Sequence, residues 1–187
     1  MAGSIMVTGL VRNLIAGLKL VSLAPVHRDA FVLQTDQLIA LLLIAIALQV
    51  GGAAIPYWPV AGIWAYGLGL ILLRYTIMLA VLQVLAGALG DWRQAGPMQV
   101  MVLAGAIWAQ TLWLIVANTI DWAALPVYSG FVISNAFLGL SGIVAVRALR
   151  LCLSTSLAVS VAGGALLVVL IGASGMLLDG APLFRRD

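Results

Sequence analysis

The sequence predicts an all-α membrane protein, a polytopic helix bundle of about five transmembrane helices with an N-terminal interfacial amphipathic helix. Of its 187 residues, 64% are hydrophobic and only 8% are charged. Soluble domains carry about 25% charged residues, so a water-soluble fold could not cover this much apolar surface. Five long segments are almost free of charge, and each is long enough to cross the roughly 30 Å hydrocarbon core. The prolines fall between these segments or at their ends, as expected for a residue that costs about 3 kcal/mol inside a helix.

Residues 4–23 are predicted to form the interfacial helix. Apolar residues recur at helical spacing and are predicted to form the face that lies on the membrane; they are Val7, Leu10, Val11, Leu14, Leu18 and Val21. Another side carries the polar residues Thr8, Arg12, Asn13 and Lys19. The basic side chains would favour the anionic cytoplasmic leaflet of a membrane. The alternative is a plain leading helix that packs against the bundle.

The transmembrane spans are expected within a single domain that covers residues 1–187. Their predicted bounds are 36–55, 60–89, 98–120, 126–146 and 154–178. Asp36 stands where it could cap the start of the first span. Segment 60–89 would be about 45 Å long as a helix, so it must tilt or protrude from the bilayer. Two interpretations of this segment stay open, a single tilted span and a re-entrant hairpin.

The basic residues of the short loops predict the orientation of the bundle, because such residues are more frequent on the cytoplasmic side. With a cytoplasmic N-terminus and five spans, that side holds Arg12, Lys19, Arg28, Arg93, Arg147 and Arg150. Only Arg185 and Arg186 then lie outside, with Arg74 uncounted. A re-entrant segment 60–89 would exchange the sides of the later loops and reduce this difference. We therefore predict a multi-pass protein of the bacterial inner membrane, with its C-terminus in the periplasm.

Arg74 is the only charged residue deep within a predicted span. A charge there costs about 2.5–3.5 kcal/mol on insertion scales, so its guanidinium should face the bundle or reach toward the headgroups. Its candidate partners are Asp36, Gln110, Ser134 and Asn135. We predict that Arg74, Asp36, Gln110 and Asn135 form a lipid-binding or buried polar site. Structural pairing or contact with a lipid phosphate is one interpretation of this set, and a role in transport is the other.

The chain lacks the sequence signatures of catalysis. It contains no P-loop and no HExxH, CxxC or GxSxG motif. His27 is the only histidine and Cys152 the only cysteine, so we expect no catalytic nucleophile with a paired general base, no metal and no cofactor. Lys and Arg are scattered along the chain, so nucleic-acid binding is not expected either. We predict that the protein is not an enzyme.

The order of the segments resembles that of a known family. An amphipathic leading helix, a short connector and five closely packed spans resemble the Yip1-like membrane domain. The stretch LIAGLKLVSLAPVHRDAFVLQTDQLIALLL, residues 14–43, is similar to the start of the membrane segment that precedes a caspase-like C13 peptidase domain in some bacterial proteins. The resemblance implies a five-span membrane domain. We expect no peptidase activity, because the sequence ends where a peptidase domain would begin.

Two functions are compatible with these features. The first is a non-enzymatic membrane scaffold or accessory subunit of a larger bioenergetic or envelope complex. Its partners would be membrane lipids and other transmembrane subunits or further copies of the same chain, because the loops offer little to a soluble partner. The second is a small-solute transporter or channel that uses Arg74 and the buried amide side chains.

Overall fold

The computed structural model of the chain describes residues 2–54, 62–63, 65–121, 126, 128–178 and 184–185. The α-helices in this part are α1 (Ala2–Val21), α2 (Thr35–Ala54), α3 (Ala65–Ala88), α4 (Ala95–Thr119), α5 (Ser129–Leu153) and α6 (Leu157–Leu178). Short 3-10 helices, η1 (Arg28–Ala30) and η3 (Trp92–Gln94), lie in the connections. Two short strands, β1 (Gly62–Ile63) and β2 (Phe184–Arg185), pair antiparallel.

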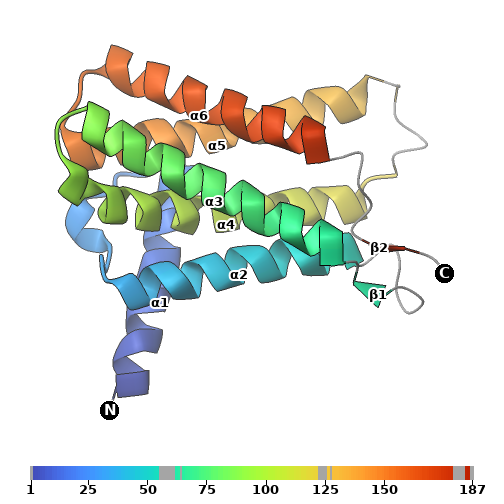
Figure 1. Ribbon diagram of the computed structural model, residues 1–187, viewed down its shortest axis with the longest axis horizontal. Helices are drawn as coiled ribbons and strands as arrows, with labels where there is room; N and C mark the ends of the chain where they lie inside the picture. The colour runs from blue at the N-terminus through green and yellow to red at the C-terminus, as the bar shows by residue number, and fades with distance from the viewer. Residues whose placement is uncertain are drawn as a thin grey trace.

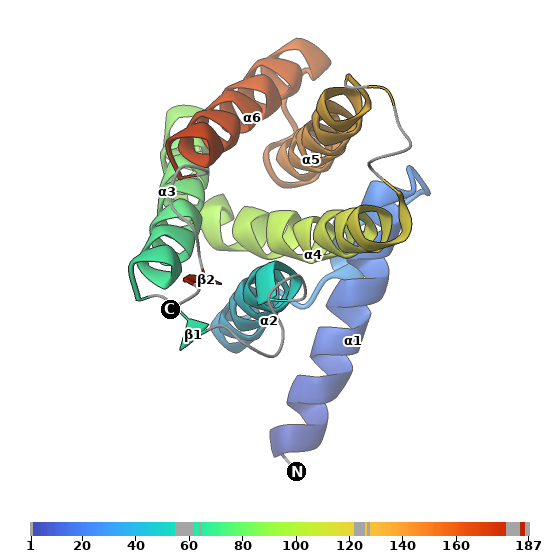
Figure 2. The same ribbon diagram turned by 90° about the vertical axis from the view of Figure 1, so that its right-hand side faces the viewer.

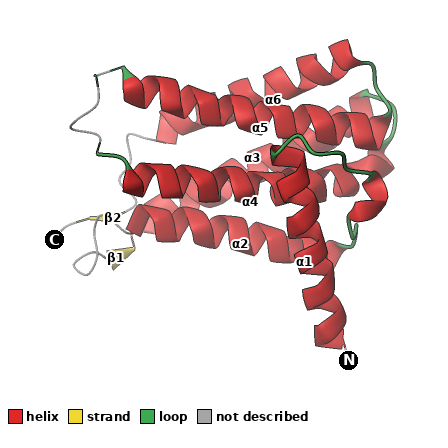
Figure 3. Cartoon of the chain, turned by 180° about the vertical axis from the view of Figure 1, so that it is seen from behind, coloured by secondary structure: helices red, strands yellow, loops and turns green. Residues whose placement is uncertain are grey.

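Helices α2 to α6 lie side by side and alternate in direction, whereas α1 lies across them near one end (Figure 1). The crosswise placement of α1 is also evident from behind (Figure 3). The end nearer α1 also holds η1, η3 and the turn between α5 and α6, while β1 and β2 lie at the opposite end. A helix that crosses a bundle in this way is oriented like an interfacial helix, parallel to the membrane plane. The predicted fold class, an all-α membrane bundle, is confirmed.

Helix α4 is the centre of the bundle, in contact with α1, α2, α3 and α5 (Figure 2). Its side chains Met98, Met101 and Leu103 are fully buried. The backbone of α1 approaches α4 closely, since a Cβ atom at Gly17 would lie 2.4 Å from the carbonyl oxygen of Ala104. Only glycine permits this contact, and such small residues let helices pack where lipid removes the hydrophobic drive.

Four helical stretches in the described residues are long and apolar enough to cross a membrane. They are Thr35–Gly52, Gly67–Ala88, Trp92–Thr119 and Asn135–Leu153. Helix α6 contributes a shorter apolar stretch, Leu157–Leu170. The protein is therefore a polytopic helical bundle with at least these candidate spans, and a fifth span through α6 stays a prediction.

The long segment 60–89 is a single helix over its described part. Helix α3 runs without interruption through 24 residues, about 36 Å at 1.5 Å per residue. A continuous helix of this length matches one span, not a re-entrant hairpin. The predicted start was too early, because Gly62 and Ile63 pair with β2 instead of joining the helix. Residues 60, 61 and 64 lie outside the described residues.

Helix α5 corrects the predicted end of the span 126–146. It continues to Leu153, and Ser154 then ends it in the left-handed conformation, with φ 48°. Arg147 and Arg150 therefore lie in the helix and not in a loop. Arginine is a good helix former, so a charged residue does not by itself end a helix.

The helix of the span predicted to start at residue 98 starts earlier in the structure, so Pro97 lies at its end but inside the helix. Helix α4 starts at Ala95, so Pro97 stands in its first turn. Backbone N–H groups in the first turn have no carbonyl partner in the helix, so a proline is tolerated there.

Candidate functional site

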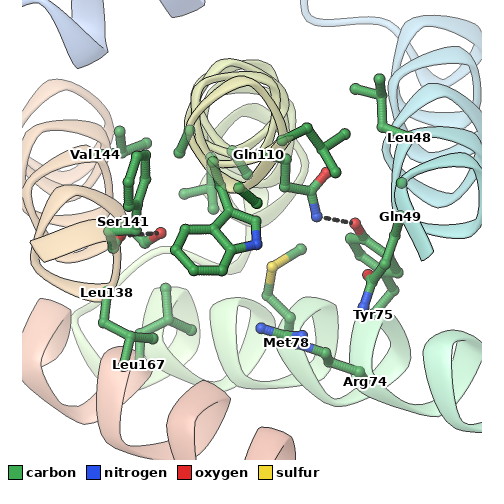
Figure 4. A pocket seen from close by; sticks show the side chains of 18 of the residues that line it. Leu48, Gln49, Arg74, Tyr75, Met78, Gln110, Leu138, Ser141, Val144 and Leu167 are labelled. Carbon is green, nitrogen blue, oxygen red and sulfur yellow. Dashed lines mark hydrogen bonds between the residues drawn. The ribbon is translucent and has the colours of Figure 1, made fainter. Parts of the chain in front are cut away.

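A cavity of about 480 Å³ lies between α2, α3, α4, α5 and α6 (Figure 4). It extends from the buried side chain of Met78 in the core to Asn118, an exposed residue close to the end of α4. The cavity thus reaches toward the end of the bundle that is remote from η1 and η3. Its volume falls within the range of roughly 300–1,000 Å³ that is typical of small-molecule sites.

One wall of the cavity is polar. It combines Gln49 from α2, Arg74 and Tyr75 from α3, and Gln110 from α4 (Figure 4). The side-chain amide of Gln110 donates a hydrogen bond through Nε2 to the Tyr75 hydroxyl oxygen at 2.6 Å. This bond joins α3 to α4 and fixes two polar side chains of the wall.

Several groups of the polar wall are left without a partner. The Oε1 atoms of Gln49 and Gln110 are buried and accept no hydrogen bond. In the described part of the chain, the half-buried Arg74 guanidinium has no hydrogen bond and no ion pair, and no described lining residue is Asp or Glu. Unpaired polar groups in such an environment are costly, which marks this wall as a place where a polar group of another molecule would be stabilised.

The opposite wall is mostly apolar, and its one labelled polar side chain, Ser141, donates a hydrogen bond to the Phe137 carbonyl oxygen at 3.1 Å. Helices α5 and α6 supply Leu138, Val144 and Leu167 to it (Figure 4). Trp113 of α4 also lines the cavity and packs edge-to-face on Phe137, with ring centroids 5.3 Å apart and an interplanar angle of 71°. Such a pair holds a large aromatic surface in a defined orientation. A cavity with one polar and one apolar wall matches an amphipathic ligand.

The structure brings together two of the four predicted site residues. Arg74 and Gln110 share the polar wall. Asp36 is exposed in the first turn of α2, at the other end of that helix from Gln49, and it does not line the cavity. Since α2 starts at Thr35, Asp36 is not the residue that precedes the helix. Asp36 instead lies in the first turn, where a negative charge is favourable near the positive end of the helix dipole.

Asn135 is exposed on α5 and is not among the described lining residues. The side chain of Ser134 lies outside the described residues. The sequence did not single out Gln49 or Tyr75 as residues of this site. Tyr75 directly follows Arg74 in the sequence, and this could have indicated that it belongs to the site. The sequence does not show, however, which side of α3 faces the core.

A second polar cluster holds α1 against the bundle. Arg147 of α5 donates hydrogen bonds to the carbonyl oxygens of Lys19 (2.9 Å), Leu20 (2.6 Å) and Ala24 (2.6 Å). The last carbonyls of a helix have no partner within it, so Arg147 satisfies the C-terminal end of α1. Trp108 of α4 adds a hydrogen bond from Nε1 to the Leu14 carbonyl oxygen at 2.7 Å.

The amide of Asn13 corrects the predicted polar side of α1. Asn13 is fully buried, accepts a hydrogen bond from the Val32 N–H at 2.7 Å and donates one to the Val32 carbonyl at 3.1 Å. It therefore belongs to the face that packs on the connector and α2. Arg12 stays exposed and donates to the carbonyl oxygens of Asp29 and Ala30 in η1.

The remaining surface of α1 is amphipathic. Val7, Val11, Ile15 and Leu18 are exposed and, at 100° per residue, fall on one stripe. Thr8, Arg12 and Lys19 form the neighbouring polar stripe, and both stripes are distinct from the packed face. Part of the predicted membrane face packs on the bundle instead, since Leu10 and Leu14 contact the core and Val21 is buried. The helix thus packs on the bundle, as the alternative expected, and it still presents an apolar and a basic stripe. Its place at a membrane interface stays a prediction.

The fold and the cavity define the chain as a polytopic membrane protein with an internal amphipathic cavity. Comparison of the chain with protein-family models, with curated proteins and with solved structures gave no match. The resemblance to the Yip1-like membrane domain stays a prediction. The function is accordingly inferred from the cavity and its polar groups.

Proposed function

We propose that the protein binds a small amphipathic molecule in the cavity and acts as a small-solute transporter. The observation that supports this function is the polar wall, where Arg74 and the Oε1 atoms of Gln49 and Gln110 face one cavity without partners. Binding sites for small molecules combine an apolar lining with a few such polar groups. The bundle helices α2 to α6 all contribute lining residues to this cavity.

The cavity supports a purely structural role less well. A bundle needed only as a scaffold gains stability when its interior is filled, because protein interiors are close-packed and voids lose dispersion contacts. A scaffold also gains nothing from an arginine held inside a span without a carboxylate partner. The accessory-subunit role stays a prediction that copurification can address.

The proposed orientation places the α1 end of the bundle in the cytoplasm of a bacterial cell. The basic residues Lys19, Arg28, Arg93 and Arg150 belong to α1, η1, η3 and the last turn of α5, all at that end. Excess Lys and Arg in short connections is typical of the cytoplasmic side. In this orientation the cavity extends from the bundle core toward the periplasmic side.

Native mass spectrometry of the protein, purified in a neutral maltoside detergent, tests the proposal. We expect a small molecule to remain bound to the wild-type protein and to be lost from the double variant Arg74→Leu/Gln110→Leu. Arg150→Leu is the matched control, because Arg150 is exposed and lies outside the described cavity lining. A stoichiometric protein partner together with an empty cavity would support the accessory-subunit role instead.

A further inference from the structure

We infer that the ligand is a single-chain anionic amphiphile whose head group also carries a hydrogen-bond donor. This inference rests on the proposed function, because it assigns a ligand class to the same cavity. The charge of the head group, its donor and its apolar chain are each supported by a different part of the lining.

The anionic charge follows from Arg74. It is the only charged side chain among the described lining residues, and none of them is acidic. A cationic ligand would be repelled by the guanidinium, and a neutral one would leave it without a counter-charge in a poorly solvated site. A carboxylate or phosphate can accept two parallel hydrogen bonds from a guanidinium.

The hydrogen-bond donor follows from the two buried amide oxygens. Gln49 Oε1 and Gln110 Oε1 can only accept, and both lack a donor. The Gln110 amide nitrogen already donates to Tyr75. A simple carboxylate offers only lone pairs, so it would satisfy Arg74 and leave both amide oxygens unpaired. A hydroxyl or N–H group close to the anionic group would donate a hydrogen bond to one of these two oxygens.

The apolar chain follows from the opposite wall, where Leu138, Val144 and Leu167 face the polar wall (Figure 4). The volume of about 480 Å³ is in the range for a single small ligand. Because Trp113 lines the cavity, a bound acyl chain would contact its indole ring. This tryptophan provides a local optical signal.

Binding of matched twelve-carbon probes tests the inference. The probes are 2-hydroxydodecanoate, dodecanoate, 1,2-dodecanediol and dodecyltrimethylammonium, each added to the protein in excess neutral maltoside detergent. The readout is quenching of tryptophan fluorescence by brominated versions of the probes. Trp113→Phe identifies the part of the quenching that comes from the cavity.

We expect 2-hydroxydodecanoate to bind most tightly. The diol should bind about tenfold more weakly, because hydrogen bonds to a charged group are the stronger ones, and dodecanoate should lie between them. The ammonium probe should not quench Trp113. In Arg74→Leu the hydroxy acid should lose its advantage over the diol, while Arg74→Lys should keep part of it. Arg150→Leu should leave the order unchanged.

The outcomes separate the two proposals. Equal binding of the diol and the hydroxy acid in the wild-type protein would overturn the anionic ligand class while leaving an amphiphile site in place. Equal binding of dodecanoate and its hydroxylated form would overturn the requirement for a donor. If no probe quenches Trp113 and no molecule is retained during purification, both the ligand class and the proposed function are wrong.

Discussion

The hydrogen bonds that hold α1 across the bundle can be removed with one substitution. Arg147→Leu deletes the bonds from the guanidinium to the carbonyl oxygens of Lys19, Leu20 and Ala24, which measure 2.9, 2.6 and 2.6 Å. The leucine side chain offers no donor in exchange. The C-terminal end of α1 then has carbonyl groups with no side-chain partner from α5.

The loss can be estimated from these contacts. Hydrogen bonds to a charged group contribute about 1.5–3 kcal/mol each, but these three share one partly exposed guanidinium and are not additive. We expect the docking of α1 to lose about 3 kcal/mol, which corresponds to a roughly 100-fold increase in its opening equilibrium. Helices α2 to α6 keep their own contacts, so the bundle should stay folded.

Hydrogen–deuterium exchange of the protein in lipid nanodiscs measures this opening. Amides in the second half of α1 should exchange about 100-fold faster in Arg147→Leu than in the wild-type protein, with α4 unchanged. Arg147→Lys should give an intermediate rate, and Arg150→Leu should have no effect because that residue is exposed. Unchanged exchange in α1, or an equal increase in α4, would refute the role assigned to Arg147.

Three further predictions concern other contacts. Gly17→Val should lower the melting temperature in detergent, because its Cβ would lie 2.4 Å from the Ala104 carbonyl oxygen, while Gly139→Ala should be neutral since its Cβ would meet nothing within 4 Å. Ala106→Phe should fill part of the cavity and weaken probe binding without lowering the melting temperature, so an unchanged affinity would place the ligand elsewhere. The Asp91 carboxylate accepts hydrogen bonds from the side chain of Gln94 and the backbone N–H of Arg93, and these bonds lower its pKa. The ionised carboxylate should therefore help to order η3 at neutral pH, and this effect should be lost as the pH falls through the lowered pKa. NMR titration of η3 measures the change.

The fold class could be predicted because its signals are local. Long uncharged segments and the placement of most prolines are visible in the sequence without knowledge of any partner. The end of α5 could not be predicted in the same way. Arg147 and Arg150 resemble loop residues by charge, and only the contact of Arg147 with α1 explains why a cation at this position is stabilised within a helix.

The candidate site was only partly predictable for a related reason. Arg74 could be singled out because a charge within a span is costly wherever it points. The partners of Arg74 depend on which sides of the helices face one another. The apolar residues of α2, α3 and α6 are distributed around the whole circumference of each helix, so their pattern does not distinguish a core-facing side from a lipid-facing side. Tyr75 of α3 was missed because this distinction was missing. Asp36 was included although it lies at the other end of α2 from the cavity, because the height of a residue along the bundle was not considered.

The crosswise position of α1 also affects the lipid around the protein. Helix α1 extends outward from the bundle near one end only (Figures 1 and 3). With the bundle across a bilayer, the molecule would therefore occupy more area in the leaflet at that end than in the other. In the proposed orientation the wider leaflet is the cytoplasmic one. A wedge of this shape fits best where the cytoplasmic leaflet is on the convex side of a curved membrane, because amphipathic helices at the interface respond to curvature. The protein should therefore concentrate in vesicles when α1 lies in the outer, convex leaflet. This enrichment should increase as the vesicle diameter decreases.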